Sequence, residues 1–375
     1  MANIVVDDPN NYLGVASPYD LSFLRALGLL AQATAPSPRS RYRPASRWTI
    51  AKYLTVCDPR RRGGSVSPFI VNPGIRDLDP HQKGVLSDDI GMAIALGLID
   101  ESHGIKGLAD AYALVSSGAL VLKTAGRHRR MPDFVLELRK PIANSKFVLL
   151  ECKGSVVPGN FANQLDSACK RQLENVSTLY GIHARTIPKI AAASELFLGG
   201  QLTIHLDDPP ELLEKPLSDQ LQANLLALEY SLFGDLRSAN DVWKAYDLPS
   251  FTASSDDSRL PDRSIDTFTD EAITTLAGKE KFGIDASGRF EAHASSRDGH
   301  ALTRVSLEMS LAAKAARKTR DWTTALDHRS VGIDTPNALP KLTEGDNGIE
   351  RRIEETAHTS TGLTVNASMH IWYEH

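Results

Sequence analysis

Two short apolar segments constrain the fold of this chain more than any other feature. Residues 131–138 read Met-Pro-Asp-Phe-Val-Leu-Glu-Leu, and residues 147–154 read Phe-Val-Leu-Leu-Glu-Cys-Lys-Gly, with a polar stretch between them. Short apolar runs rich in β-formers and bounded by turn-forming residues are typical of strands joined in a hairpin. We therefore expect an antiparallel pair that carries Asp133, Glu151 and Lys153 where the strands end.

The strand period determines which of these side chains can meet. Positions two apart on a strand share a face, so Glu151 and Lys153 point the same way and Cys152 packs inward on the other face. Directly opposed residues of an antiparallel pair also share a face. Asp133 therefore joins Glu151 and Lys153 only if paired positions sum to an even number such as 284 or 286; an odd register turns it away.

The pattern Pro-Asp, a gap, then Glu-x-Lys, carried by Asp133, Glu151 and Lys153, resembles the PD-(D/E)xK nuclease superfamily. The gap of 18 positions (151 minus 133) suits two strands and a turn. The resemblance implies an α/β fold with a restriction-endonuclease-like αβββαβ core, a mixed central sheet flanked by helices. It also implies metal-dependent hydrolysis of phosphodiester bonds. Asp before a strand and Glu-x-Lys within one are also frequent surface patterns. The resemblance is better supported because these three charged residues lie at the ends of two apolar strands, where unpaired charges are costly.

The carboxylates of Asp133 and Glu151 are of the kind that holds Mg²⁺ or Mn²⁺ together with waters and substrate oxygens. The resemblance adds the backbone carbonyl of Cys152 as a further metal ligand. Lys153 would orient or deprotonate the attacking water, or neutralise the charge of the transition state.

The resemblance also implies an acid from the first core helix and a glutamine from the helix after the second motif strand. Asp89 is the best positional match for the acid, and Asp88 is the next. Plain stabilisation of a helix N-terminus, with Ser87 as N-cap, is the alternative explanation of both acids. Gln164 is the expected glutamine and is counted among the catalytic residues.

The hydrophobic pattern predicts the core topology in order along the chain. It indicates a helix over 86–103, a strand over 111–122, the two motif strands, a helix over 161–180, and strands over 189–198 and 201–206. This order matches the core expected from the resemblance. We therefore assign residues 81–210 to the nuclease-like core.

The flanking regions are less regular. Residues 1–80 are expected to form an N-terminal extension with a helix over 17–32, and residues 211–375 a C-terminal helical plus β-hairpin region. Within the latter the sequence predicts helices over 218–233, 241–246 and 305–316, hairpin turns at 286–288 and 297–299, and a final strand over 363–373.

Charge is uneven along the chain although the net charge is only −4. Residues 39–62 hold eight basic side chains against one acid and are interleaved with aromatic rings, a composition that can follow a phosphate backbone and stack on bases. An exposed basic loop beside a core tryptophan explains the segment equally well. The expected nucleic-acid contacts are Arg41, Arg43, Arg47, Arg129, Arg130 and Arg171.

Several classes of protein do not fit the sequence. No apolar run approaches a membrane span, and the N-terminus lacks a signal-peptide pattern, so a cytoplasmic protein without a membrane partner is expected. The three cysteines have no disulfide or zinc spacing. No phosphate-binding Gly-x₄-Gly-Lys-Ser/Thr motif occurs, so any ATPase or activating step must come from a partner protein.

The function expected is therefore a Mg²⁺-dependent endodeoxyribonuclease in bacterial restriction or antiviral defence. Two alternatives remain open: a non-catalytic nucleic-acid-binding or assembly subunit that keeps the fold, and an RNA-cleaving effector. The oligomeric state is left open.

Overall fold

The computed structural model describes residues 2–9, 11, 13–34, 57–58, 70–71, 75, 77–116, 118–124, 130–142, 145–157, 159–196, 202–207, 223, 227, 236–246, 281–284, 290–295, 301–311, 341–344, 350–360 and 363–373. Most of the basic segment 39–62 and of the helix predicted over 218–233 lies outside these residues. Within the basic segment the structure describes β3 (Cys57–Asp58). This strand pairs antiparallel with β4 (Ile70–Val71), which follows the basic segment in the chain.

A seven-stranded mixed sheet lies at the centre of the fold, in the order β2-β1-β12-β11-β8-β7-β5. At the β5 edge of the sheet, β5 pairs antiparallel with β7 and β7 pairs antiparallel with β8. The next strand, β11, runs parallel to β8. A parallel neighbour requires a crossover, which the helix after β8 supplies. The strands are β1 (Ala2–Asp7), β2 (Tyr19–Leu21), β5 (Ile105–Asp110), β7 (Phe134–Ile142), β8 (Ser145–Ser155), β11 (Lys189–Glu195) and β12 (Leu202–Asp207).

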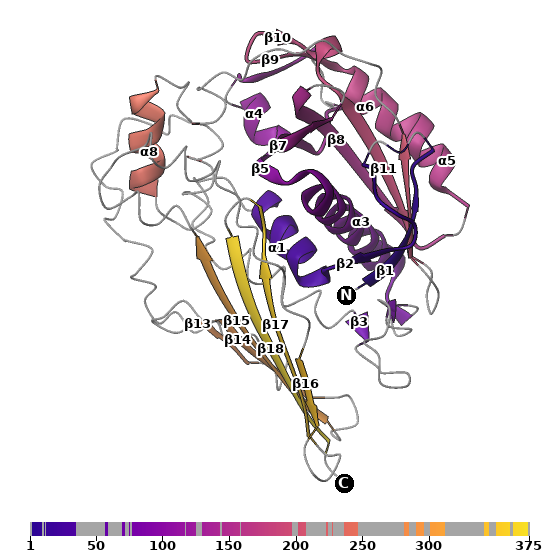
Figure 1. Cartoon of the computed structure of the whole chain (residues 1–375), viewed down its shortest axis with the longest axis vertical. Helices are drawn as coiled ribbons and strands as arrows, with labels where there is room; N and C mark the ends of the chain where they lie inside the picture. Colours follow the sequence, from indigo (N-terminus) through magenta and orange to yellow (C-terminus); the bar gives the residue numbers. More distant parts are fainter. Residues whose placement is uncertain are drawn as a thin grey trace.

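Helices flank both faces of this sheet (Figure 1). One face is covered by α1 (Phe23–Ala33) and α3 (Pro80–His103). The other face carries α4 (Ala111–Ser116), the helix formed by α5 (Phe161–Asn163), the π-helix η2 (Gln164–Cys169) and α6 (Lys170–Glu174), and a small sheet. That small sheet has the order β10-β9-β6, with β6 (Leu120–Leu122), β9 (Val176–Leu179) and β10 (Ile182–His183), and a 3₁₀ turn, η3 (Ala184–Thr186), follows it. The chain is thus a mixed α/β protein with a central mixed sheet.

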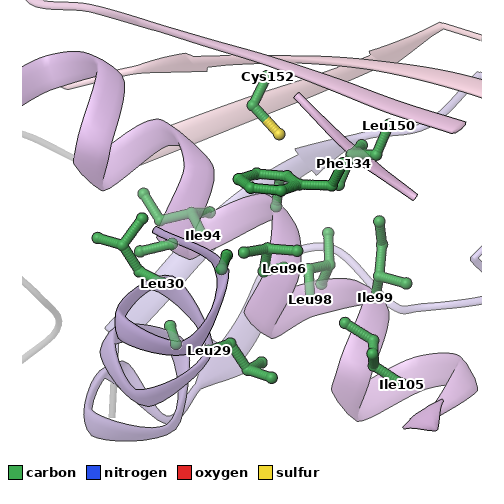
Figure 2. Packing of buried hydrophobic residues seen from close by; sticks show 14 of the residues in the cluster. Leu29, Leu30, Ile94, Leu96, Leu98, Ile99, Ile105, Phe134, Leu150 and Cys152 are labelled. Carbon is green, nitrogen blue, oxygen red and sulfur yellow. The ribbon is translucent and has the colours of Figure 1, made fainter. Parts of the chain in front are cut away.

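Alternating side chains of β7 and β8 supply both hydrophobic cores. Phe134, Leu150 and Cys152 are buried on the α1 and α3 side, where Figure 2 shows them with Ile94 of α3. Val135 and its neighbours on the opposite face pack toward α4 and α6. The prediction that Cys152 packs inward is confirmed. Because both faces are covered, both strands read as nearly continuous apolar runs.

The register of the motif hairpin is even. Phe134 pairs with Leu150 and Val135 with Leu149, so paired positions sum to 284. By the same register Asp133 lies opposite Glu151 and shares its face.

The start of α3 differs from the prediction. The helix begins at Pro80, and Asp79 is its N-cap, with a side chain that accepts hydrogen bonds from the backbone N–H groups of His81 and Gln82. Ser87 is therefore not an N-cap. Asp88 and Asp89 lie in the third turn, beyond the reach of the helix N-terminal dipole, so the alternative explanation of these two acids is wrong.

Two further segments of the core differ from the prediction. Residues 111–122, expected as a strand, form α4 and then β6, and the core strand is instead β5. The helix expected to continue to residue 180 ends at Glu174, and β9 follows it. In addition β1 and β2, which the sequence places in an N-terminal extension, are strands of the main sheet.

The C-terminal part forms a second sheet of six antiparallel strands, in the order β13-β14-β15-β18-β17-β16. The two predicted hairpins and the final strand are confirmed, whereas the helix predicted over 305–316 is wrong, because its residues up to Leu311 belong to β15. Ahead of this sheet lies α8 (Leu236–Ala245). The strands are β13 (Lys281–Ile284), β14 (Phe290–Ser295), β15 (Ala301–Leu311), β16 (Lys341–Glu344), β17 (Glu350–His358) and β18 (Leu363–Tyr373).

The second sheet meets α1 at the turn between β17 and β18, and Figure 1 shows its strands extending from there away from the main sheet. The buried carboxylate of Asp100 in α3 links α1, β5 and the second sheet. It forms an ion pair with Arg25 of α1 at 2.6 Å, and it accepts hydrogen bonds from the backbone N–H groups of Ile105 in β5 and of Ser360, which follows β17. Within the described residues no helix is long and apolar enough to cross a membrane.

Candidate functional site

Asp133 immediately precedes β7 and is tied to β8 by backbone contacts. Its backbone N–H donates to the carbonyl of Leu150 at 3.0 Å, and its Oδ2 accepts the backbone N–H of Cys152 at 2.8 Å. The carboxylate is thus held over the strand that carries Glu151 and Lys153. Pro132, which has no N–H to donate, stands just before the strand begins and leaves this pairing intact.

Glu151 and Lys153 form an ion pair on the same face of β8. Lys153 Nζ lies 2.6 Å from Glu151 Oε1, and the Glu151 side chain is fully buried while that of Lys153 is 26% exposed. Glu151 Oε1 also accepts a hydrogen bond from Gln172 Nε2. Its second oxygen, Oε2, is buried without a hydrogen-bond partner.

The environment of the trio shifts the protonation of all three groups. Burial raises the pKa of the Glu151 carboxyl to about 8, and the nearby Asp133 carboxylate adds to this rise while Lys153 opposes it. Burial also raises the pKa of Asp133, against the effects of Lys153 and of the Cys152 N–H. Burial alone would lower the pKa of Lys153, but Glu151 and Asp133 outweigh it, so its pKa lies above the ordinary value. Two buried acids that share one cation favour a bound proton or a second cation between them.

Two glycines allow α3 to cross the end of β8 at close range. A Cβ on Gly154 would lie 1.7 Å from the carbonyl oxygen of Ser87, and a Cβ on Gly91 would lie 2.9 Å from the carbonyl oxygen of Lys153. Backbone therefore meets backbone here. Asp88 is brought to the end of β8, where its Oδ1 accepts the backbone N–H of Gly154 at 3.4 Å.

Asp88 is therefore a helix acid close enough to act on the trio. Its charge raises the pKa values of both Asp133 and Lys153. The sequence favoured Asp89, which is half-buried one residue further along α3. The one-residue choice could not be made without the helix phase, which is set where Gly91 and Ser87 of α3 pack against the end of β8.

The helix after β8 lies beside the trio and brings two glutamines to it. Gln164 Nε2, as placed in the structure, donates to the carbonyl of Gly154 at 3.3 Å, so this predicted residue contacts the backbone of the motif strand. Gln172, which the sequence analysis missed, contacts the Glu151 carboxylate itself. Asp110 at the end of β5 is a further acid near Asp133: burial raises its pKa, the Tyr112 N–H opposes that, and the Asp133 charge adds to it.

The predicted nucleic-acid contacts are only partly described. Arg130 and Arg171 are exposed, which leaves both side chains accessible to solvent. Arg41, Arg43, Arg47 and Arg129 lie outside the described residues.

In the described part of the chain no three His, Cys, Asp or Glu side chains are grouped as a ready metal site. Two carboxylates, those of Asp133 and Glu151, do converge, and Glu151 Oε2 is a buried acceptor without a partner. One or two carboxylates completed by waters and substrate oxygens are the usual protein share of a Mg²⁺ site. The residues present therefore fit a hard divalent cation.

Comparison of the chain with protein-family models, with curated proteins and with solved structures found no match. The class of protein is therefore given by the geometry alone: a mixed α/β protein whose central sheet carries a buried Asp-Glu-Lys trio at the end of an antiparallel strand pair.

Proposed function

We propose that this chain is a metal-dependent nuclease that hydrolyses phosphodiester bonds of DNA. The observation that carries the proposal is the position of Asp133, which faces Glu151 and Lys153 across the β7–β8 pair. Buried charges at the ends of two apolar strands are costly unless they pair with one another or bind a ligand. A trio of two acids and one lysine at a strand end is suited to binding a cation next to a phosphate.

The order of elements supports a restriction-endonuclease-like αβββαβ core. Along the chain α3 is followed by β5, β7 and β8, then by the helix of α5 to α6, then by β11. The three strands form a meander, and β11 joins next to β8 in parallel. This is the arrangement that the resemblance implies, with α4, β6, β9 and β10 as additions.

The chain's own residues divide the work of the proposed reaction. Asp133 and Glu151 would hold Mg²⁺ or Mn²⁺, with the Cys152 carbonyl as a further ligand and Asp88 in place of Asp89 as the helix acid. A divalent cation there would offset the charge that builds on the phosphoryl oxygens and the leaving group. Lys153 has a pKa above its ordinary value, so in the metal-free protein it is a cation at neutral pH. We therefore assign Lys153 to stabilising the transition-state charge rather than to deprotonating water.

The proposal is tested by incubating the full chain with supercoiled plasmid, single-stranded DNA and RNA, each in Mg²⁺ and in Mn²⁺. Cleavage of DNA that requires the cation supports the proposal. Cleavage of RNA alone would instead identify an RNA-cleaving effector. Binding without any cleavage would identify a non-catalytic subunit, and would overturn the proposed activity of the chain on its own.

A further inference from the structure

Two glutamines of one helix contact β8 at two different positions along the strand. Gln164 reaches the carbonyl of Gly154, and Gln172 reaches Oε1 of Glu151. Three strand residues span about 10 Å, and eight helical residues rise about 12 Å. The helix therefore runs back along β8, and both amides face the strand.

In an ordinary α-helix the two amides would lie on the same broad face but not in line with one another. Eight residues turn an α-helix by about 800°, which leaves the second side chain about 80° beyond two full turns. The chain instead forms a π-helix over Gln164–Cys169. Such a turn accommodates one extra residue, so eight residues behave roughly as seven do in an α-helix, and positions seven apart share a face. The π-helical turn is thus what aligns Gln172 with Gln164.

Gln172 gives one oxygen of Glu151 a second donor, and the carboxyl also lies within interaction distance of Asp133. Oε1 receives both Lys153 Nζ at 2.6 Å and the Gln172 amide, whereas Oε2 is buried without a partner. Two donors on one oxygen restrict the rotation of the carboxylate and so limit where its other oxygen can lie. Partners of this kind orient the ligands of a metal and are worth about ten- to a hundredfold in metal affinity.

We propose that Gln172 is a positioning residue, which holds Glu151 so that Oε2 is presented to a divalent cation beside Asp133. This inference rests on the metal-dependent site proposed above and names a residue that the motif does not contain. The π-helical turn supplies the register that this contact needs.

The test is Mn²⁺ binding to the full chain, measured by calorimetric titration with Mn²⁺ alone. Gln172→Met keeps the length of the side chain and removes its donor, and Gln172→Asn keeps an amide that is too short to reach Glu151. Gln82→Met, on an exposed glutamine of α3, is the matched control. We expect both Gln172 variants to bind Mn²⁺ about ten- to a hundredfold more weakly than the wild type, and Gln82→Met to bind within twofold of it.

Melting temperatures of the metal-free variants separate positioning from folding. We expect them to stay close to that of the wild type, and we expect any lost cleavage to return as Mn²⁺ is raised. Unchanged Mn²⁺ affinity in both Gln172 variants would overturn the inference, as would a wild type that does not bind Mn²⁺. A wild type whose Mn²⁺ affinity depends on Gln172 but that cleaves no nucleic acid would leave this inference standing and remove the proposed nuclease activity.

Discussion

The carboxylate of Asp133 accepts the backbone N–H of Cys152, with 2.8 Å between Oδ2 and the nitrogen. This hydrogen bond ties the residue before β7 to the middle residue of the Glu-Cys-Lys run on β8. It holds the acid on the face of Glu151 and Lys153, where an odd register would have turned it away. The chemistry proposed for the chain depends on this one relationship.

Substitution of the two α3 acids should have unequal effects on the proposed activity. Asp88→Asn removes the charge that contacts the Gly154 N–H and acts on Asp133 and Lys153. We expect it to lower metal-dependent cleavage about tenfold or more, and Asp89→Asn to lower it less than threefold, as measured by initial rates on plasmid. Equal losses in the two variants would contradict the assignment of Asp88.

Two glycines of α3 form a matched pair for testing the approach of α3 to β8. A Cβ at Gly91 meets the backbone of Lys153 and Gly154, whereas a Cβ at Gly84 meets no atom within 4 Å. We expect Gly91→Ala to lower the free energy of unfolding by about 1–3 kcal/mol. Gly84→Ala should raise it by about 0.5–1 kcal/mol, because alanine is the better helix former. Urea unfolding of both variants gives the comparison, and stabilisation by Gly91→Ala would show that the helix does not lie against the strand.

Arg25 neutralises the buried carboxylate that joins α1 and α3 to the second sheet. Its removal in Arg25→Met leaves Asp100, whose side chain is fully buried, without its cation. We expect a loss of about 3–5 kcal/mol in the free energy of unfolding, reduced by the backbone N–H groups that also reach Asp100. Arg185→Met, on an exposed arginine of η3, should change it by less than about 0.5 kcal/mol. Urea unfolding curves for the two variants decide the point, and equal small effects would refute the role of Arg25.

The raised pKa of Glu151 predicts how the stability of the metal-free protein depends on pH. The folded protein keeps a proton on Glu151 up to about pH 8, whereas the unfolded chain releases it near the ordinary value of 4.5. The folded state therefore binds more protons between these values, and stability falls as pH rises through this window, by up to about 1.4 kcal/mol per pH unit. Glu151→Gln should flatten the profile of unfolding free energy between pH 5 and pH 8. Parallel profiles for wild type and variant would contradict the raised pKa.

Part of the fold could be predicted from sequence because the signals were local. The motif hairpin and β11 are apolar runs, and β12 and β18 alternate apolar and polar residues. The requirement for an even register followed from the strand period alone. The sequence also contains a signal for the start of α3, because Asp79 is a typical N-cap residue and Pro80 is favoured at the first helical position. Ser87 was preferred because the apolar pattern becomes regular only after it.

The remaining errors arose where the hydrophobic pattern fits more than one structure. The run over 111–122 is apolar, but its first half holds the helix formers Ala111, Ala113 and Leu114 and is helical, and Asp110 Oδ1 accepts the Tyr112 N–H at the start of α4. The contact of Gln172 with Glu151 could not be predicted from spacing alone, since the π-helical turn that brings it into line with Gln164 has no signal in the hydrophobic pattern. In β15 the spacing of Val305 and Met309 fits both a helix and a strand.

Cleavage of supercoiled plasmid by the wild type and by Lys153→Ala, side by side in Mg²⁺ and in Mn²⁺, tests the central claim most directly. We predict cation-dependent cleavage by the wild type and a loss of about 10²–10⁴-fold in Lys153→Ala, with DNA binding by the variant retained within a fewfold. Equal cleavage by both proteins would contradict the site assigned here, and no cleavage by the wild type in either cation would contradict the proposed activity of the chain on its own.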